Sequence, residues 1–473
     1  MKQTSDEDTC PCLAHRGLSS ENSSYLSFLY RHLKQPCDTV ESAVGLALSI
    51  RCIHAGQTGG AMRVLLATQF YPPIIGGEER HVRNLAHGLT ARGHDVTVAT
   101  LAQNGFPARD NNGSVKIRRL PATIRRMSGL HADSQRTHAP PLPDPELSLA
   151  MKQLVDEVRP DIIHAHNWMV YACLPLKALF RIPLVLTLHD YSLICAKKNL
   201  MRAYTPCTGP GLGKCLPCAS DHYGALKGVV TYAGLSAMRP FGRRAIDVFI
   251  AVSQAVARDN RLAGLRHQVI PNFVPDHLEA SPAPNERTRL LPQQPFILFV
   301  GDLMLLKGVG TLLDAYRNLR APPPLVLIGR RLPDTPAELP PGVHLFESWP
   351  HEDVLAAWQR CLVGVVPSVL REACATVIIE AMSFGKPVLA SAIGGNTDLV
   401  ESGVSGLLFP PGDVAALAAA LTDVIGDAGL RQRLSEGSAR RAPLFQAASV
   451  IGRIEKVYDD LLADRRQAAV GRA

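Results

Sequence analysis

The 473-residue chain contains no apolar run that approaches the roughly 20 residues a membrane-spanning helix needs. Its N-terminus, MKQTSDEDTC, is acidic where a secretory signal peptide would be basic, and no long apolar core follows it. It also lacks the aromatic-rich basic motifs of nucleic-acid-binding modules. These absences argue against a membrane-spanning, exported or nucleic-acid-binding protein, and they predict a cytoplasmic location.

Positive charge is concentrated in the first half of the chain. Residues 62–280 contain 26 lysine and arginine residues against 16 acidic ones, whereas the segments before and after each carry a net charge of −1. Such an excess favours anionic lipid, acidic acceptors or phosphates as partners. An ordinary solvated basic surface explains it equally well, so contact with an anionic membrane surface is one of two readings.

The length of the chain predicts two domains. Residues 1–61 are polar and serine-rich, and we expect either a mis-started extension with Met62 as the working start or a disordered tail. Buried-strand and amphipathic-helix patterns then alternate through residues 62–280, and they restart over residues 296–445 after the proline-rich linker 281–295. This alternation predicts an α/β fold of two doubly wound, Rossmann-like domains, with a ligand in the cleft between them.

Two glutamates, Glu372 and Glu380, lie eight positions apart around a predicted helix start near Ala375 or Thr376. Free backbone amides at such a start suit a pyrophosphate and need no metal ion. A carboxylate one turn inside the helix can accept hydrogen bonds from ribose hydroxyls, and one before the helix can face a sugar hydroxyl. The pair therefore predicts a site for a nucleotide diphosphate sugar, although without context Glu372 is equally an N-terminal charge and Glu380 a solvated residue.

Two further loops follow predicted strands. In FYPPIIGGEERHV, Gly76 and Gly77 would let backbone amides approach a ligand closely. The order of the glycines departs from the dinucleotide fingerprint, so an NAD enzyme is not expected. Lys307, in GDLMLLKG, can reach a phosphate lying over the edge of the second sheet. Taken alone, each is explained by a simple turn or a surface lysine.

The segment E-x7-E followed by AMSFGKPVLASAIGG resembles the donor site of the retaining GT-B glycosyltransferases of family 4, also called glycosyl transferases group 1. The stretches GGEERHV, PDIIHAH, LTLHD, AVSQAV and VIPNFV resemble the same family, in order, from about Met62 to about Leu462. The resemblance implies a GT-B fold. It also implies metal-independent transfer of a sugar, with retention, from a nucleotide diphosphate sugar to a glycan or lipid-linked acceptor in polysaccharide biosynthesis.

The resemblance also implies roles for single residues. His189 would face the reacting sugar and Glu372 would contact the sugar ring, as the catalytic residues. Residues 446–473 would form a helix that crosses back onto the first domain. The donor-binding residues that the resemblance implies are Gly77, Lys307, Cys374, Ala375, Thr376, Val377 and Glu380.

The chain departs from the family pattern at two places. Asp302 stands where the family has arginine, and we expect Arg330 or Arg331 to substitute for it. Cys374-Ala375 replaces the usual Phe-Gly. These changes keep open a catalytically degenerate GT-B scaffold protein, against which the retained site residues count. A GT-B sugar-nucleotide epimerase is a further alternative, and the loop GGEERHV argues against it.

A cysteine-rich insert, residues 195–218, follows His189-Asp190 directly. A C-x2-C pair can supply two corners of a tetrahedral metal site. The insert therefore predicts a structural zinc ion or iron–sulfur cluster, placed as a lid over the acceptor side, with free thiols as the alternative. A disulfide is the weaker expectation in a reducing cytoplasm. The ligands of this predicted site are Cys195, Cys207, Cys215 and Cys218.

Overall fold

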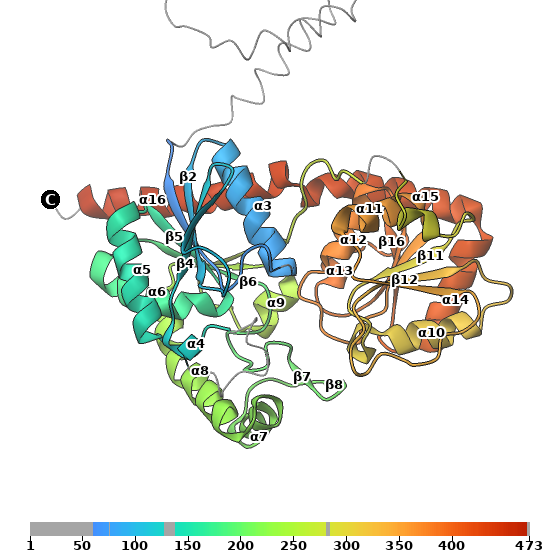
Figure 1. Cartoon of the computed structure of the whole chain (residues 1–473), viewed down its shortest axis with the longest axis horizontal. Coiled ribbons are helices and arrows are strands. Elements are labelled where there is room, and N and C mark those ends of the chain that lie inside the picture. Colours follow the sequence, from blue (N-terminus) through green and yellow to red (C-terminus); the bar gives the residue numbers. More distant parts are fainter. Residues whose placement is uncertain (1–59, 75, 127–137, 281–283, 471–473) are drawn as a thin grey trace, which may run out of the picture. The chain divides into compact units, whose positions relative to one another are not determined.

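The first sheet has eight strands in the order β10-β9-β6-β5-β1-β2-β4-β3, and neighbouring strands run parallel except for β3 and β4. The computed structural model describes residues 60–74, 76–126, 138–280 and 284–470 (Figure 1), so the expectation for residues 1–61 falls almost wholly outside the described residues. The strands are β1 (Arg63–Ala67), β2 (Asp95–Leu101), β3 (Arg109–Asn112), β4 (Val115–Leu120), β5 (Ile162–His166), β6 (Leu184–Leu188), β9 (Val248–Ala251) and β10 (His267–Val269).

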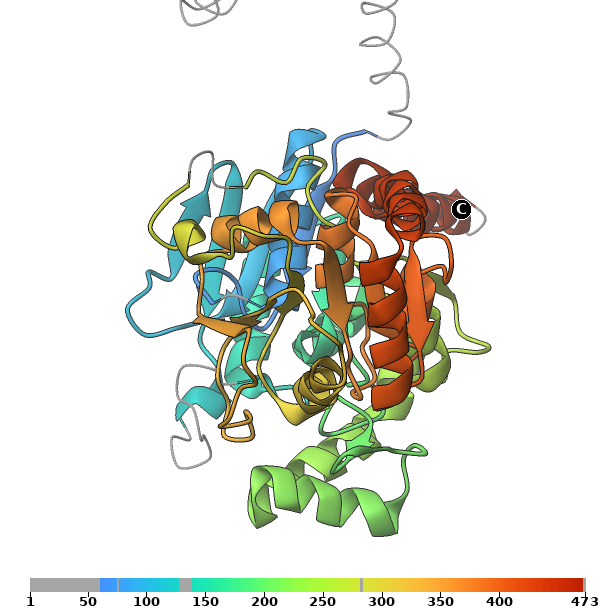
Figure 2. The same cartoon turned by 90° about the vertical axis from the view of Figure 1, so that its right-hand side faces the viewer.

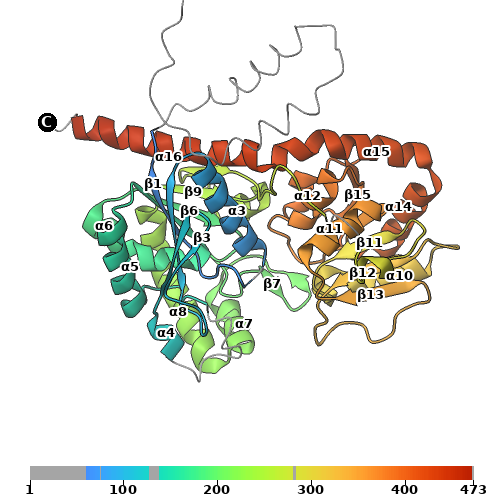
Figure 3. The ribbon, with the colours of Figure 1, turned by 45° about the horizontal axis from the view of Figure 1, so that its top comes forward.

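After the exposed Arg63, strand β1 is apolar and buried, because helices cover both of its faces. Leu65 and Ala67 pack into the core formed with α5 and α6, whereas Val64 and Leu66 pack against α3 and α16. The last helix, α16, lies against α3, as Figure 3 shows, and so the end of the chain completes the first domain. The helices are α3 (Gly77–Ala91), α4 (Thr123–Arg126), α5 (Pro145–Val158), α6 (Val170–Phe180), α9 (Gln254–Asp259) and α16 (Ala447–Val470), with the 3-10 turn η2 (Asn167–Met169).

The cysteine-rich insert forms a small subdomain that is larger than the sequence predicted. It contains a two-stranded hairpin and two helices that pack on one another, drawn in green in Figure 2. The cysteines at positions 215 and 218 lie on the first of these helices. The elements are β7 (Met201–Arg202), β8 (Thr205–Pro206), α7 (Leu212–Tyr223) and α8 (Ala225–Ala245).

The second sheet has six parallel strands in the order β13-β12-β11-β14-β15-β16. Its strands are β11 (Ile297–Val300), β12 (Leu325–Gly329), β13 (Val343–Glu347), β14 (Val363–Val366), β15 (Val388–Ser391) and β16 (Gly406–Phe409). The helices around it are α10 (Val309–Arg317), α11 (His351–Arg360), α12 (Thr376–Ser383), α13 (Asn396–Leu399), α14 (Val414–Gly426) and α15 (Ala428–Arg441), with the 3-10 turns η3 (Thr288–Leu290), η4 (Leu305–Lys307) and η5 (Ala442–Phe445).

The connection between the two sheets is held against the second domain. Asn285 donates a hydrogen bond from Nδ2 to Oδ1 of Asp353 on α11, over 2.6 Å. The Arg360 guanidinium donates to the carbonyls of Thr288 and Pro292. The described part of this proline-rich segment is therefore fixed in place.

Among the described residues, no helix is both long and apolar enough to cross a membrane.

Candidate active site

Each sheet has a point where the strand order reverses. In the first sheet the order changes direction between β1 and β5, and in the second between β11 and β14. Open α/β sheets bind ligands beside the carboxyl ends of the two strands at such a point. The segments that follow β1, β11 and β14 contain the predicted donor-binding residues and Glu372, whereas His189 and the four cysteines of the insert follow β6.

Lys307 and Glu372 form an ion pair at the second of these points, with 2.7 Å between Nζ and Oε1. Ser368 donates from Oγ to the same carboxylate oxygen over 2.6 Å. Glu372 is buried, whereas the Lys307 side chain keeps 30% of its surface exposed. The ammonium group is thus oriented by a carboxylate and is still accessible to an anion.

The two loops that hold this pair are tied together by their backbones. The amides of Val369 and Leu370 both donate to the carbonyl of Leu306, over 3.0 and 2.9 Å. Gly308 has φ 78°, and a Cβ at this position would lie 1.9 Å from the carbonyl oxygen of Pro367. Only glycine allows this approach, which explains the Lys-Gly order in the sequence.

Helix α12 begins at Thr376, as the sequence predicted, and no side chain caps its N-terminus. The amides of Thr376 and Val377 in the first turn have no acceptor within the helix, so they can bind an anion. The N-cap is Ala375, and Cys374 before it is buried. Burial raises the pKa of the Cys374 thiol to about 12, so the thiol stays neutral and adds no negative charge to the helix start.

Glu380 lies one turn inside α12 and is 2% exposed. Its Oε1 lies 2.8 Å from Nε2 of His351 and 3.5 Å from a guanidinium nitrogen of Arg80 on α3. Its Oε2 is buried and has no hydrogen-bond partner within the described part of the chain. Because an unsatisfied buried carboxylate oxygen is costly, a ligand hydroxyl at this point would be bound favourably.

His189 belongs to a chain of hydrogen bonds. Nδ1 of His166 lies 2.9 Å from Nε2 of His189, and Nδ1 of His189 lies 3.2 Å from Oδ1 of Asn272. The Asn272 amide donates in turn to the carbonyl of Cys374, before α12. Both ring nitrogens of His189 therefore have protein partners. For His189 to contact a sugar through its ring, Nε2 would have to exchange His166 for the ligand.

His81, His166 and His189 together place their ring nitrogens within 4.8 Å of one another, as in a candidate metal centre. Neither ring nitrogen of His81 has a hydrogen-bond partner among the described residues. Nearby, His164 is fully satisfied by Tyr458 and Thr187, at 2.6 and 2.7 Å. Strand alternation predicts His164 and His166 on one face, and their rings stack there.

Burial lowers the pKa of these four histidines, to about 4 for His189 and to about 3 for His164. The unfolded chain binds protons near pH 6.5, so these groups favour unfolding as the pH falls below 6.5. We therefore expect each of them to lower stability by at most about 1.4 kcal/mol per pH unit between pH 6.5 and its folded pKa.

The measurement is the urea midpoint at several pH values, together with the ring-proton NMR shifts of the histidines. If the four buried rings titrate near the ordinary histidine value of about 6.5, the cluster is not neutral below that pH and the expectation is wrong.

Charged residues that the sequence did not predict as site residues lie beside the first switch point. The Asn167 amide donates to Glu78 Oε2 over 2.8 Å and to Asp190 Oδ2 over 3.2 Å. Burial raises the pKa of Glu78 to about 8 and also raises that of Asp190, while it lowers that of Lys198. Glu78 directly follows Gly77, and Asp190 directly follows His189. Their positions next to two predicted site residues are the sequence feature that could have identified them.

Gly77 is the first residue of α3, which also begins without a side-chain cap. A Cβ at Gly77 would meet no heavy atom of the described residues within 4 Å. Packing within the protein therefore does not require glycine here, and the space is open to a ligand.

Asp302 departs from the family pattern, and its negative charge is neutralised by a neighbouring arginine. The Arg330 guanidinium donates two hydrogen bonds to the Asp302 carboxylate, over 2.9 and 2.8 Å. Arg331 is bound to Glu347 instead. Both arginines that we expected to replace the missing family arginine are thus engaged with carboxylates. The pairing removes the repulsion that an isolated Asp302 would exert on a phosphate.

The four cysteines of the insert line one small cavity of about 30 Å³. All of them are free thiols. The amide of Gly211 donates to Cys215 Sγ over 3.3 Å, and backbone amides of residues 197–200 surround the Cys195 sulfur. Within the described residues, only the histidine trio brings three ligand atoms within 4.8 Å of one another, so the sulfurs stand farther apart than in a closed zinc site.

Comparison with known proteins places this geometry in a family. The family described as Glycosyltransferase Family 4 matches residues 75–278, and that described as Glycosyl transferases group 1 matches residues 284–441. Glycogen synthase from Mycobacterium tuberculosis (strain CDC 1551 / Oshkosh) is 26% identical over 411 residues, covering 80% of this chain and 90% of its own length. D-inositol 3-phosphate glycosyltransferase from Acidothermus cellulolyticus is 27% identical over 435 residues, with 84% and 88% covered.

Among solved structures, Anabaena HepE in complex with UDP-glucose superposes with a TM-score of 0.60 at 20% identity, over 84% of this chain and all of that one. The two family matches are adjacent and together span most of the chain. The chain belongs to the GT-B glycosyltransferases of family 4, glycosyl transferases group 1.

Proposed function

We propose that this glycosyltransferase transfers a sugar from a nucleotide diphosphate sugar, with retention of configuration, to a glycan or lipid-linked acceptor bound mainly by the first domain. The proposal rests on one observation above the others. Lys307, the uncapped start of α12 and the unpartnered Glu380 oxygen follow one another at the second switch point. They match the phosphates and the ribose of such a donor in chemical type and in order.

In the proposed reaction, the bond between the anomeric carbon and the diphosphate oxygen breaks, and a bond to the acceptor oxygen forms on the same face. The acceptor proton passes to the departing phosphate, so no enzyme nucleophile is required. Lys307 and the α12 amides stabilise the negative charge that develops on the leaving group. Glu372 holds Lys307 in place and contacts the sugar ring. We assign no metal ion to this step.

The test is nucleotide binding followed by turnover. UDP, GDP and ADP are screened for thermal stabilisation of the full chain. A ligand at about 100 times its Kd adds about 2.7 kcal/mol to the free energy of unfolding. The nucleotide sugars of the base that binds are then assayed for hydrolysis and transfer, and NMR of the product gives the anomeric configuration. If none of the three nucleotides stabilises the protein at millimolar concentration, the chain is a scaffold protein and the proposal fails.

We also propose that Cys195, Cys207, Cys215 and Cys218 bind a structural zinc ion or iron–sulfur cluster. Support comes from the shared cavity and from the amides directed at two of the sulfurs, since such hydrogen bonds stabilise metal-bound thiolates. A zinc ion, at about 2.3 Å from each sulfur, would require the sulfurs to move closer together.

Elemental analysis of the full chain, purified without oxygen, should find about one zinc, or several iron atoms, per molecule. Chelation should then lower the melting temperature, because metal binding contributes to folding. The buried Cys361, outside the insert, provides the control: Cys361→Ala should keep the metal, whereas Cys215→Ser should lose it. Folded, active and metal-free protein would contradict the proposal.

A further inference from the structure

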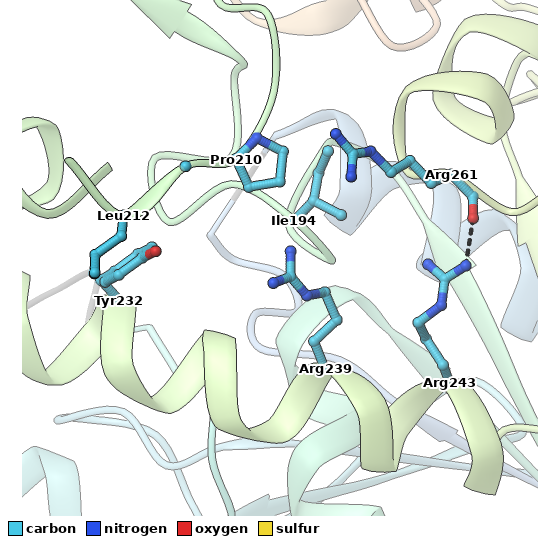
Figure 4. A pocket seen from close by; sticks show the side chains of 8 residues that line it. Ile194, Pro210, Leu212, Tyr232, Arg239, Arg243 and Arg261 are labelled. Carbon is cyan, nitrogen blue, oxygen red and sulfur yellow. Dashed lines mark hydrogen bonds between the residues drawn. The ribbon is translucent and has the colours of Figure 1, made fainter. Parts of the chain in front are cut away.

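A second pocket, of about 470 Å³, lies between helix α8 and the loop that leads into α7. We call it the arginine pocket, and Figure 4 shows it. The side chains of Arg239 and Arg261 converge from opposite sides on the space beside Ile194. The volume is within the range of small-molecule sites. The lining residues are Ile194, Pro210, Gly211, Leu212, Tyr232, Arg239, Arg243 and Arg261.

Among the described residues that line it, the arginine pocket has three cations and no carboxylate. Arg243 donates only to backbone carbonyls, those of Asn260 and Arg261. In the described structure, the guanidinium groups of Arg239 and Arg261 take part in no ion pair or hydrogen bond. Burial, together with the charges of these two arginines, lowers the pKa of Arg243. The three charges therefore repel one another without local compensation.

The nearest acidic residues along the chain are already paired. Asp247 binds Lys177, and Asp259 binds Arg258 and Arg371. They cannot neutralise the arginine pocket without breaking these pairs. An anion from outside the chain would relieve the repulsion. Guanidinium groups bind phosphate oxygens with two parallel hydrogen bonds, which makes arginine the preferred residue for phosphate recognition.

Hydrogen bonds connect this pocket to the candidate active site. Asn260 donates from Nδ2 to the carbonyl of Asp190, the neighbour of His189, over 3.0 Å. The carbonyl of Asn260 accepts from Arg243 in turn, over 3.3 Å. The pocket also includes Ile194, a few residues after Asp190. A ligand held by the arginines therefore lies against the segment that leads away from the proposed reaction centre in the first domain.

From this arrangement we infer that the arginine pocket binds a phosphate or diphosphate group carried by the acceptor. The identification of the ligand as the acceptor rests on the proposed function. The binding of an anion in the arginine pocket does not depend on it. The apolar and aromatic walls, Ile194, Leu212 and Tyr232, would contact the part of the acceptor attached to the phosphate. The phosphate belongs either to a water-soluble acceptor or to the headgroup of a lipid.

The first test uses inorganic pyrophosphate and isothermal titration calorimetry on the full chain. Because the proposed donor site also binds phosphates, Lys307→Ala is measured in parallel to identify that contribution. We expect Arg239→Gln to weaken pyrophosphate binding at the remaining site about tenfold, which corresponds to about 1.4 kcal/mol. Arg244→Gln is the matched control, since Arg244 is exposed on the same helix, is not part of the pocket and carries the same charge.

Equal weakening by Arg239→Gln and Arg244→Gln would show a diffuse basic surface and overturn the inference. So would the absence of any pyrophosphate binding in the Lys307→Ala protein. Failure of the proposed function has a different signature, because it would abolish nucleotide binding and leave the effect of Arg239→Gln unchanged. Melting temperatures of the Arg239→Gln and Arg244→Gln proteins that match that of their parent protein establish that these two substitutions leave the fold intact.

The second test distinguishes the source of the phosphate. Sedimentation with vesicles of phosphatidylcholine containing phosphatidylglycerol is compared with vesicles of phosphatidylcholine alone. Loss of vesicle binding in Arg239→Gln but not in Arg244→Gln supports a lipid headgroup in the pocket. Tight pyrophosphate binding without vesicle binding supports a soluble phosphorylated acceptor. Vesicle binding that both variants reduce equally, with no pyrophosphate bound in the pocket, overturns the inference.

Discussion

Replacing Lys307 by methionine should lower kcat/KM for sugar transfer by about 10²- to 10³-fold, with most of the loss in kcat. Lys307 is the one side-chain cation that we assign to the leaving diphosphate, and removing a single such group from a preorganised site has an effect of this size. The loss belongs in kcat because the charge on the departing phosphate grows as the bond breaks. Steady-state kinetics with the nucleotide sugar identified in the binding screen provide the measurement.

The same substitution leaves the buried Glu372 without its cation, so stability and activity have to be separated. Because Lys307 is partly exposed, we expect a loss of about 1 kcal/mol rather than the larger cost of a fully buried pair. The double variant Lys307→Met/Glu372→Gln should recover that stability and remain inactive. Lys152→Met removes an exposed ion pair with Asp156 and should change neither quantity. Full activity in Lys307→Met would show that the diphosphate binds elsewhere.

Local sequence patterns predicted the second domain more completely than the first. The helix start predicted near Ala375 or Thr376 is confirmed, since α12 begins at Thr376, where the pattern changes from a loop to a helical apolar repeat. Strand β3, by contrast, has the polar sequence RDNN and lies at an antiparallel edge, where alternating exposure gives no apolar signature. Helix α8 was missed for a related reason: few of its residues are buried and Pro240 lies inside it.

In the site, motif spacing predicted which residues lie close together but not how their charges are compensated. The pairing of Lys307 with Glu372 depends on two loops 65 positions apart along the chain. The pairing of Asp302 with Arg330 likewise joins the ends of neighbouring strands, and no local pattern reports it. The raised pKa of Glu78 is a consequence of burial, which depends on the packing of the whole first domain.

Glu380→Ala should weaken nucleotide binding by about 10- to 100-fold, corresponding to about 1.4–2.7 kcal/mol. Hydrogen bonds to a charged acceptor contribute about 1.5–3 kcal/mol each, and the buried Oε2 has no partner among the described residues that would compete for it. His351→Ala removes the neighbour that orients the carboxylate but leaves the carboxylate itself, so its effect should be smaller. Titration calorimetry with the preferred nucleoside diphosphate measures both variants.

A ligand that lacks the ribose hydroxyls separates direct contact from a general disturbance of α12. If Glu380 binds the ribose, the 2′,3′-dideoxy nucleotide should bind the unsubstituted protein about as weakly as the normal nucleotide binds Glu380→Ala. Removing both partners should then add little, because the two changes delete the same interaction. Additive losses would mean that Glu380 acts through the helix and its contacts with His351 and Arg80. Unchanged affinity in Glu380→Ala would place the ribose outside this helix altogether, and the donor orientation proposed above would be wrong.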